Sequence, residues 1–298
     1  MIFTVTFNPA IDYVMQAEDV VFGKTNRSKN EEIHFGGKGI NVSVVLSELG
    51  VPTTALGFTA GFTGEALEKA VNEKGIKSDF IRLSSGNTRI NVKLKGKVET
   101  EINAIGPDIG KGELNRLFEK LNTLKSGDTL LLAGSIPSSL PNDIYEQIAK
   151  SLQNSEVRLV VDATGDLLLK VLKYKPFLIK PNREELEEIM GEPLETTEKL
   201  IAAANDLRKK GAKNVLVSLG AEGALLIAEN GEIYRRSAFI VNAVNTVGSG
   251  DSMIAGFLAG YEKGYEYALL LGAAAGAATA ALSGLATKQK IEQLINQQ

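Results

Sequence analysis

Residues 129–133 read Thr-Leu-Leu-Leu-Ala and begin the part of the chain that decides the fold. This run has the length and apolar character of a buried strand, and similar runs follow at 158–162, 177–180 and 214–218. Apolar residues recur at helical spacing in segments before and between these runs, at 114–124, 142–153 and 196–210. Strands that alternate with helices predict βαβ units, so we expect an α/β fold whose mostly parallel central sheet carries helices on both faces.

The N-terminal half contains two segments with a different pattern. From 89 to 94 polar and apolar residues alternate, which predicts a strand with one polar and one apolar face. A second extended piece after residue 97 would complete a hairpin, and residues 11–35 contain further isolated β-type pieces. We therefore expect one α/β domain over 1–298, with a small β-sheet lid made by insertions near 11–35 and 87–105.

Composition excludes several kinds of partner. Hydrophobic residues make up 44% of the 298 residues and the formal net charge is −3, which is ordinary for a globular protein and indicates no nucleic-acid partner. The apolar run at 268–282 is rich in alanine and glycine and shorter than the ~20 residues of a membrane span, so we expect a buried helix and no membrane partner. The lack of cysteine and of a signal peptide is consistent with a cytoplasmic location.

His34 is the only histidine in the chain. A general base that works near neutral pH is usually a histidine, a carboxylate or a lysine. The chain offers little choice of histidine, so we expect a carboxylate or a lysine to serve.

Residues 245–256 read Asn-Thr-Val-Gly-Ser-Gly-Asp-Ser-Met-Ile-Ala-Gly and are the most informative for chemistry. Gly248 and Gly250 let successive backbone N–H groups point into one space, and a helix with its positive N-terminal end follows at once. Such a loop would bind a transferring phosphoryl group, with Asp251 placed to accept a proton from the attacking hydroxyl. Alternatively, Asp251 only complements the helix dipole, which stabilises a helix by ~0.3–1 kcal/mol.

Two other motifs allow both a structural and a functional interpretation. Residues 35–41, Phe-Gly-Gly-Lys-Gly-Ile-Asn, form a glycine-rich turn at a helix start, where Lys38 and Asn41 could bind a ligand. Asn182 and Glu185 have the spacing of a helix capping box, and their oxygens are also ligands that Mg²⁺ accepts. The spaced glycines in 218–223 suit either a turn between strands or a backbone that passes a nucleotide.

Together these segments resemble the ribokinase-like carbohydrate kinases of the pfkB type, in the same order along nearly the whole chain. The resemblance is carried by the segments 8–12, 36–41, 180–185, 218–223 and 246–251. The usual Gly-Ala-Gly-Asp of that family is Gly-Ser-Gly-Asp here, which keeps both glycines and the acid. Within the family, Thr-Arg-Ile-Asn-Val-Lys-Leu at 88–94 is most similar to the bacterial 1-phosphofructokinases.

The resemblance implies a ribokinase-like fold, ATP and Mg²⁺ as cofactors, a homodimer through the lid, and a role for each matching residue. Asp251 would be the base, and Gly248, Ser249 and Gly250 the anion hole. Substrate contacts are implied for Asp12, Gly37, Lys38, Asn41, Arg89, Asn91, Lys93 and Ser135. Nucleotide contacts are implied for Lys24, Lys180, Asn182, Ser218, Gly220, Gly223, Thr246, Gly248, Gly250, Thr279 and Ser283. Magnesium would be positioned, directly or through water, by Asn182, Glu185 and Asp162.

Three functional hypotheses follow from the resemblance. The first is transfer of the ATP γ-phosphoryl group to O6 of D-fructose 1-phosphate. The second keeps the enzyme but changes the sugar phosphate to tagatose 6-phosphate or fructose 6-phosphate. The third is a sugar or nucleotide sensor that kept the fold without the chemistry, because a fold alone does not determine function.

Overall fold

A ten-stranded, mostly parallel sheet forms the middle layer of the structure, a computed structural model that describes residues 1–18 and 20–297. The strand order is β14-β13-β12-β11-β10-β9-β1-β4-β5, with β6 paired to β4. The strands are β1 (Ile2–Thr6), β4 (Thr53–Thr59), β5 (Lys77–Ser78), β6 (Ile81–Arg82), β9 (Thr129–Ala133), β10 (Arg158–Asp162), β11 (Leu178–Ile179), β12 (Asn214–Ser218), β13 (Ala224–Ile227) and β14 (Ile233–Arg236). Only β12–β13 and β13–β14 pair antiparallel.

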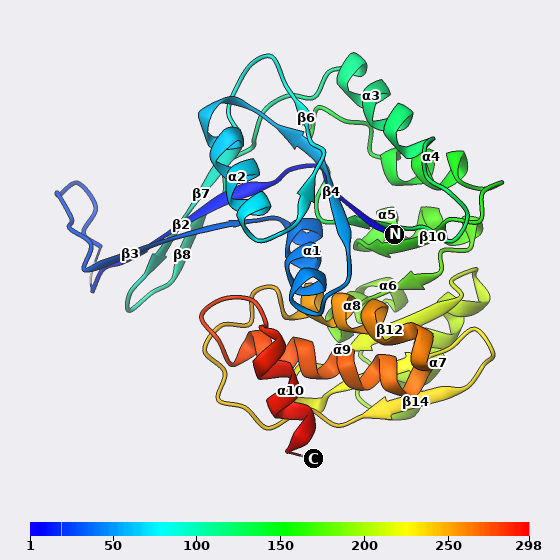
Figure 1. The fold of residues 1–298 in the computed structure, drawn as a ribbon. Coiled ribbons are helices and arrows are strands. Elements are labelled where there is room, and N and C mark those ends of the chain that lie inside the picture. Colours follow the sequence, from blue (N-terminus) through cyan, green and yellow to red (C-terminus); the bar gives the residue numbers. More distant parts are fainter. Residues whose placement is uncertain (19, 298) are drawn as a thin grey trace.

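Helices cover both faces of this sheet (Figure 1). One face packs against α3 (Lys111–Leu121), α4 (Ile144–Ser151), α5 (Gly165–Val171), α6 (Arg183–Met190) and α7 (Thr197–Lys209). The other packs against α1 (Lys38–Glu48), α8 (Ser249–Gly260), α9 (Tyr265–Ala280) and α10 (Lys288–Asn296). Within β9, Leu130 and Leu132 belong to the first core and Leu131 to the second, because successive side chains of a strand point to opposite faces. The predicted three-layer arrangement is confirmed.

Helices α8 and α9 pack closely because glycine removes side chains from their interface. A Cβ atom on Gly256 would lie 2.4 Å from the carbonyl oxygen of Leu271, which no larger residue could accept. The apolar run that begins at Ala268 therefore lies inside the protein, as predicted. In the part of the chain that the structure describes, no helix is both long and apolar enough to cross a membrane.

A second, four-stranded sheet projects from the layered body (Figure 1). Its strand order is β3-β2-β7-β8, from β2 (Ala10–Gln16), β3 (Asn30–Gly36), β7 (Arg89–Lys95) and β8 (Thr100–Ile102). The β2–β7 pair is parallel and the outer pairs are antiparallel. These strands come from the two segments in which we expected a lid. Helix α2 (Gly61–Glu73) contributes to a smaller core with α1 and β4. We interpret the chain as a single domain that carries this lid sheet.

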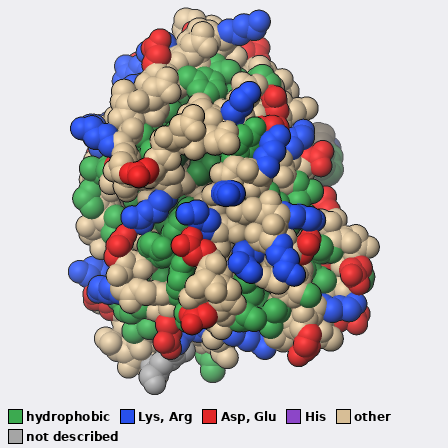
Figure 2. All heavy atoms as spheres, turned by 90° about the vertical axis from the view of Figure 1, so that its right-hand side faces the viewer, with side chains coloured by type: hydrophobic (Ala, Val, Ile, Leu, Met, Phe, Trp, Pro, Cys, Tyr) green, Lys and Arg blue, Asp and Glu red, His purple; other side chains and the backbone are tan. Residues whose placement is uncertain are grey.

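The fold gathers the chemically interesting residues at one edge of the large sheet. Strands β1, β9, β10, β11 and β12 run parallel, so their carboxyl ends meet on the same side. In open α/β sheets, ligands bind outside these carboxyl ends. Figure 2 shows the side of the molecule that lies on the right in Figure 1. Basic and acidic side chains are both present there among hydrophobic and polar ones.

Candidate active site

Asp251 lies in the first turn of α8, directly after a sharp backbone turn. Gly248 caps the helix with φ 83°, in the left-handed region that favours glycine. A Cβ there would approach Leu285 Cδ2 to 2.6 Å, so a larger residue would have to displace the end of that side chain as well as adopt a strained conformation. The Asp251 side chain is only 5% exposed, and Asn41 Nδ2 donates a hydrogen bond of 2.8 Å to its Oδ2.

The surroundings of Asp251 raise its affinity for a proton. Burial, and after it the nearby charge of Asp162, raise the pKa of this carboxyl from 3.8 to about 6. The hydrogen bond from Asn41 and the charges of Lys38 and Lys180 act in the opposite direction. Asp251 is therefore ionised at neutral pH and titrates close to it, which suits proton transfer near physiological pH.

Asp162, at the end of β10, is bound by two lysines. Its side chain is buried, Lys38 Nζ lies 2.9 Å from Oδ2, and Lys180 Nζ lies 3.3 Å from Oδ1. Burial alone would raise the pKa of Asp162, but the two ammonium groups outweigh it and hold the pKa below its usual value. A Cβ on Gly250 would lie 3.1 Å from Lys180 Nζ, so this positive charge lies against the glycine loop.

The polar face of the lid sheet presents charged side chains in a row. Asn91 Nδ2 donates to Asp12 Oδ1 over 2.8 Å, and Lys93 Nζ lies 3.4 Å from Asp12 Oδ2. Arg89 is partly buried, and its Nε donates to the carbonyl oxygen of Asn8 over 3.2 Å. The pairing Ala10↔Arg89 and Asp12↔Asn91 across β2–β7 puts these side chains on one face.

A cleft of about 730 Å³ separates this face from the loops around 243–247 and 283–287. Six of the predicted site residues line it: Asp12, Gly37, Asn41, Lys93, Thr246 and Ser283. His34 and Glu101 also line it, although the sequence reasoning assigned them no role. Strand alternation could have indicated them, because His34 lies opposite Asp12 on β3 and Glu101 opposite Lys93 on β8.

The residues predicted for a nucleotide are spread over neighbouring loops. Ser218 ends β12 and bridges Asn182, while Gly220 and Gly223 flank the short 3₁₀ turn η2 (Gly220–Glu222). Thr279 is fully buried, and its hydroxyl is bonded to Ser252 and to the N–H of Ala286, so its hydroxyl is engaged within the protein.

Two of the predicted contacts lie on exposed loops outside the lining of the cleft. Lys24 lies in the segment between β2 and β3. Ser135 is exposed just after β9. The roles of Lys24 and Ser135 in binding remain predictions from the family resemblance.

The model of the pfkB family of carbohydrate kinases matches residues 5–292. The chain belongs to this family. A 1-phosphofructokinase of Bacillus subtilis is 44% identical over 87% of this chain and 84% of its own length. A D-tagatose-1-phosphate kinase of Bacillus licheniformis is 34% identical over the same shares. The crystal structure of a putative phosphofructokinase from Staphylococcus aureus superposes with a TM-score of 0.88 at 43% identity, covering 100% of this chain and 97% of that one. The protein is therefore a carbohydrate kinase with the ribokinase-like fold.

The residues of this pfkB kinase do not fit a magnesium ion that the protein itself ligates. Both oxygens of Asp162 are bound to lysines, which leaves little room for a cation. Asn182 Oδ1 accepts from the N–H of Glu185, and Glu185 Oε2 accepts from the N–H of Asn182, so the capping-box interpretation is confirmed. Within residues 1–18 and 20–297, no three Asp, Glu, His or Cys side chains group as metal ligands. Magnesium brought by ATP, held by phosphate oxygens and water, agrees with these residues.

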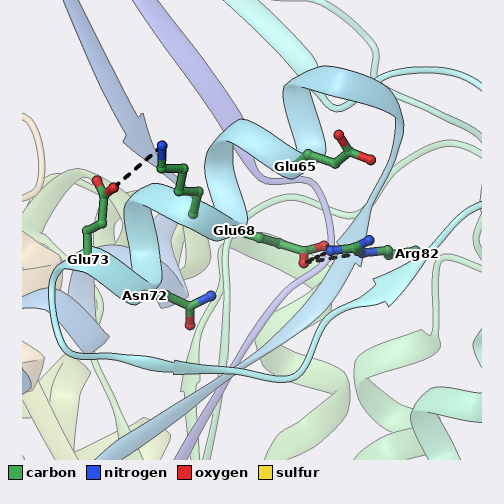
Figure 3. Close-up of a pocket in the computed structure, with 6 residues that line it drawn as sticks. Glu65, Glu68, Asn72, Glu73 and Arg82 are labelled. Carbon is green, nitrogen blue, oxygen red and sulfur yellow. Dashed lines mark hydrogen bonds and ion pairs between the residues drawn. The ribbon is translucent and has the colours of Figure 1, made fainter.

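A second hollow on the outer side of α2 is unrelated to the cleft (Figure 3). Arg82 reaches across it to Glu68, with Nη2 2.8 Å from Oε2. Lys69 and Glu73 pair at 3.9 Å on the neighbouring turn of the helix. The hollow is lined almost entirely by charged side chains that already have partners, so it offers no second site.

Proposed function

We propose that this pfkB kinase transfers the γ-phosphoryl group of ATP to O6 of D-fructose 1-phosphate and forms the 1,6-bisphosphate. The single observation that carries the proposal is the hydrogen bond between Asn41 and Asp251. This hydrogen bond connects the glycine-rich motif at 35–41, beside the lid, to the start of α8, where the phosphoryl group would bind. The sugar and the phosphoryl group would therefore meet at the carboxylate of Asp251. The 44% identity to a 1-phosphofructokinase supports the choice of sugar.

In the proposed reaction Asp251 is the general base. Asn41 engages Oδ2, so Oδ1 would accept the proton of the O6 hydroxyl. The bond between O6 and the γ-phosphorus forms as the bond from that phosphorus to the β–γ bridging oxygen breaks, and ADP leaves with the electron pair. The backbone N–H groups of residues 248–250 and the Lys180 ammonium group would stabilise the negative charge of the phosphoryl group during transfer.

The phosphate already present on the sugar would bind on the polar face of the lid. Arg89 and Lys93 supply positive charge there, and Asp12 supplies an acceptor for sugar hydroxyls. Arg89 Nε and Nη1 donate to the carbonyl oxygens of Asn8 and Ala104, so the planar guanidinium group is fixed while its remaining N–H groups can meet phosphate oxygens.

The test is a panel of sugar phosphates assayed with ATP. We expect kcat/KM for D-fructose 1-phosphate to exceed that for D-tagatose 1-phosphate, fructose 6-phosphate and tagatose 6-phosphate by about tenfold or more, because misplaced hydroxyl or phosphate groups leave buried partners unpaired. A higher value with tagatose 1-phosphate would favour the second candidate, which the 34% identical kinase supports. Absence of ATP consumption with every sugar would favour a sensor.

Arg89→Ala in the same panel tests the phosphate site. We expect a loss of roughly 10²-fold with phosphorylated sugars, from hydrogen bonds to a charged group, and little change with free fructose. The matched control is Arg82→Ala, which removes an arginine from the outer hollow and should leave both activities unchanged. Equal losses with free and phosphorylated sugar would remove Arg89 from the phosphate site.

We also propose that two copies of the chain pair through their lids. The face of the lid opposite the cleft exposes Ile90 and Ile102, with 40 and 60% of their surface accessible. Since the other face already forms the cleft, a second lid is the partner that would cover these side chains without blocking the substrate.

A further inference from the structure

We infer that Asp162 is a positioning residue for phosphoryl transfer, and that its buried carboxylate fixes the ammonium groups of Lys38 and Lys180 on the path of the phosphoryl group. The inference rests on the proposed function and adds to it a residue that touches neither sugar nor nucleotide. It replaces the expectation that Asp162 positions magnesium.

The first support is geometric. Lys38 begins α1 beside the sugar half of the site, and Lys180 follows β11 on the nucleotide half. Each lysine contacts a different oxygen of the same carboxylate, at 2.9 and 3.3 Å. Asp162 therefore connects the sugar half and the nucleotide half of the site, because it forms an ion pair with one lysine from each half. A lysine has a long flexible stem, so fixing its ammonium group before substrate arrives lowers the entropy cost of using it.

The second support is the balance of charge in a dry site. Asp162 is only 2% exposed and Lys180 only 6%. A buried ionic group persists when its partners compensate the loss of water, and the two lysines here balance the negative charges of Asp162 and of ionised Asp251. Lys180 Nζ lies against Gly250, so its positive charge is next to the loop that precedes Asp251.

The third support is that Asp162 acts on the base through space. Its negative charge raises the proton affinity of Asp251, while Lys38 and Lys180 lower it. Glu185, from α6, adds a further negative charge that acts on Lys38. Removing Asp162 would therefore leave two unrestrained lysines and a more acidic base, both of which oppose transfer.

The test compares wild type with Asp162→Asn, once the wild type has been shown to phosphorylate its sugar phosphate. We expect kcat to fall by roughly 10- to 100-fold while the Kd for ATP is unchanged or lower, because freed lysines still bind phosphate in the ground state. The acidic limb of the pH profile of kcat/KM should move to lower pH. The substrate phosphate also titrates, near pH ~6, but identically in both proteins.

Asp166→Asn is the matched control, since this exposed side chain lies four positions further along, in the first turn of α5. It should leave kcat and the pH profile unchanged. Restoration of the Asp162→Asn variant by excess Mg²⁺ would overturn the inference in favour of a metal role. An unmoved acidic limb, or wild-type kcat, would also overturn it.

A second variant keeps the inference testable if Asp162→Asn does not fold. Lys38→Met leaves Asp162 paired with Lys180 and removes one positive charge that acts on Asp251. The acidic limb should then move to higher pH, opposite to the shift expected for Asp162→Asn. A shift to lower pH, or none, would contradict the assigned arrangement of charges.

Discussion

Asp251, the proposed general base, lies in an environment that is unfavourable for its own charge. The carboxyl is buried, and its pKa in the folded protein is about 6 against 3.8 for an unperturbed group. A raised folded-state pKa means that the stability contributed by this group is fully present below about pH 4 and is lost as the pH rises through about 6. At neutral pH the ionised base therefore destabilises the fold.

Asp251→Asn should accordingly stabilise the protein at alkaline pH. We expect the free energy of unfolding at pH 8 to rise by up to about 3 kcal/mol, and the gain to shrink as the pH falls below about 6. Thermal or denaturant unfolding at pH 8 and pH 5 measures this difference, with Asp166→Asn as the exposed control. A variant less stable than wild type at pH 8 would contradict the raised pKa.

At the scale of single elements, the capping box at the start of α6 illustrates a motif with two interpretations. Asn182 and Glu185 satisfy each other's backbone N–H groups at 2.7 and 2.9 Å. We expect Asn182→Ala to lower the free energy of unfolding by ~0.5–2 kcal/mol, as for other helix caps. Thr196→Ala, which removes the cap of α7 far from the site, is the control and should cost a similar amount. Wild-type stability of the Asn182 variant would contradict the structural role.

An element can be predicted from the sequence when the residues that determine it are neighbours in the chain. The buried strands β9, β10 and β12 match their predicted ranges, because an apolar run of strand length is a local signal. Strands β13 and β14 were not predicted. The turn that leads from β12 into β13 needs Gly223, whose added Cβ would lie 2.0 Å from the carbonyl oxygen of Arg236 at the end of β14, and this neighbour is visible only after folding.

The contacts of the candidate site also exceed what spacing in the sequence can predict. Asn41 and Asp251 are 210 positions apart, and only the strand order of the folded sheet brings them together. The local glycine patterns indicated two loops, and the family resemblance indicated that the loops belong to one site. The partners of Asp162 could not be predicted from the sequence. A carboxylate at a strand end can pair with a metal or with a lysine, and only the folded structure shows the two lysines.

At the scale of the whole molecule, the lid makes assembly a measurable property. We expect sedimentation velocity at micromolar concentration to show a dimer, since exposed isoleucines on the lid would be buried between two copies. Ile102→Lys should produce monomers by placing a charge in that interface. Ile233→Lys, a similarly exposed isoleucine on β14 of the large sheet, should leave the dimer intact. A monomeric wild type would contradict pairing through the lid.

The most direct test of the whole account is the turnover of Asp251→Asn with ATP and D-fructose 1-phosphate. The substitution keeps the shape of the side chain and removes its ability to accept a proton. We expect kcat to fall by ~10²–10⁴-fold, the range for loss of a general base, while equilibrium binding of ATP stays close to that of wild type. Near-normal turnover in this variant would contradict the assignment of Asp251 as the base.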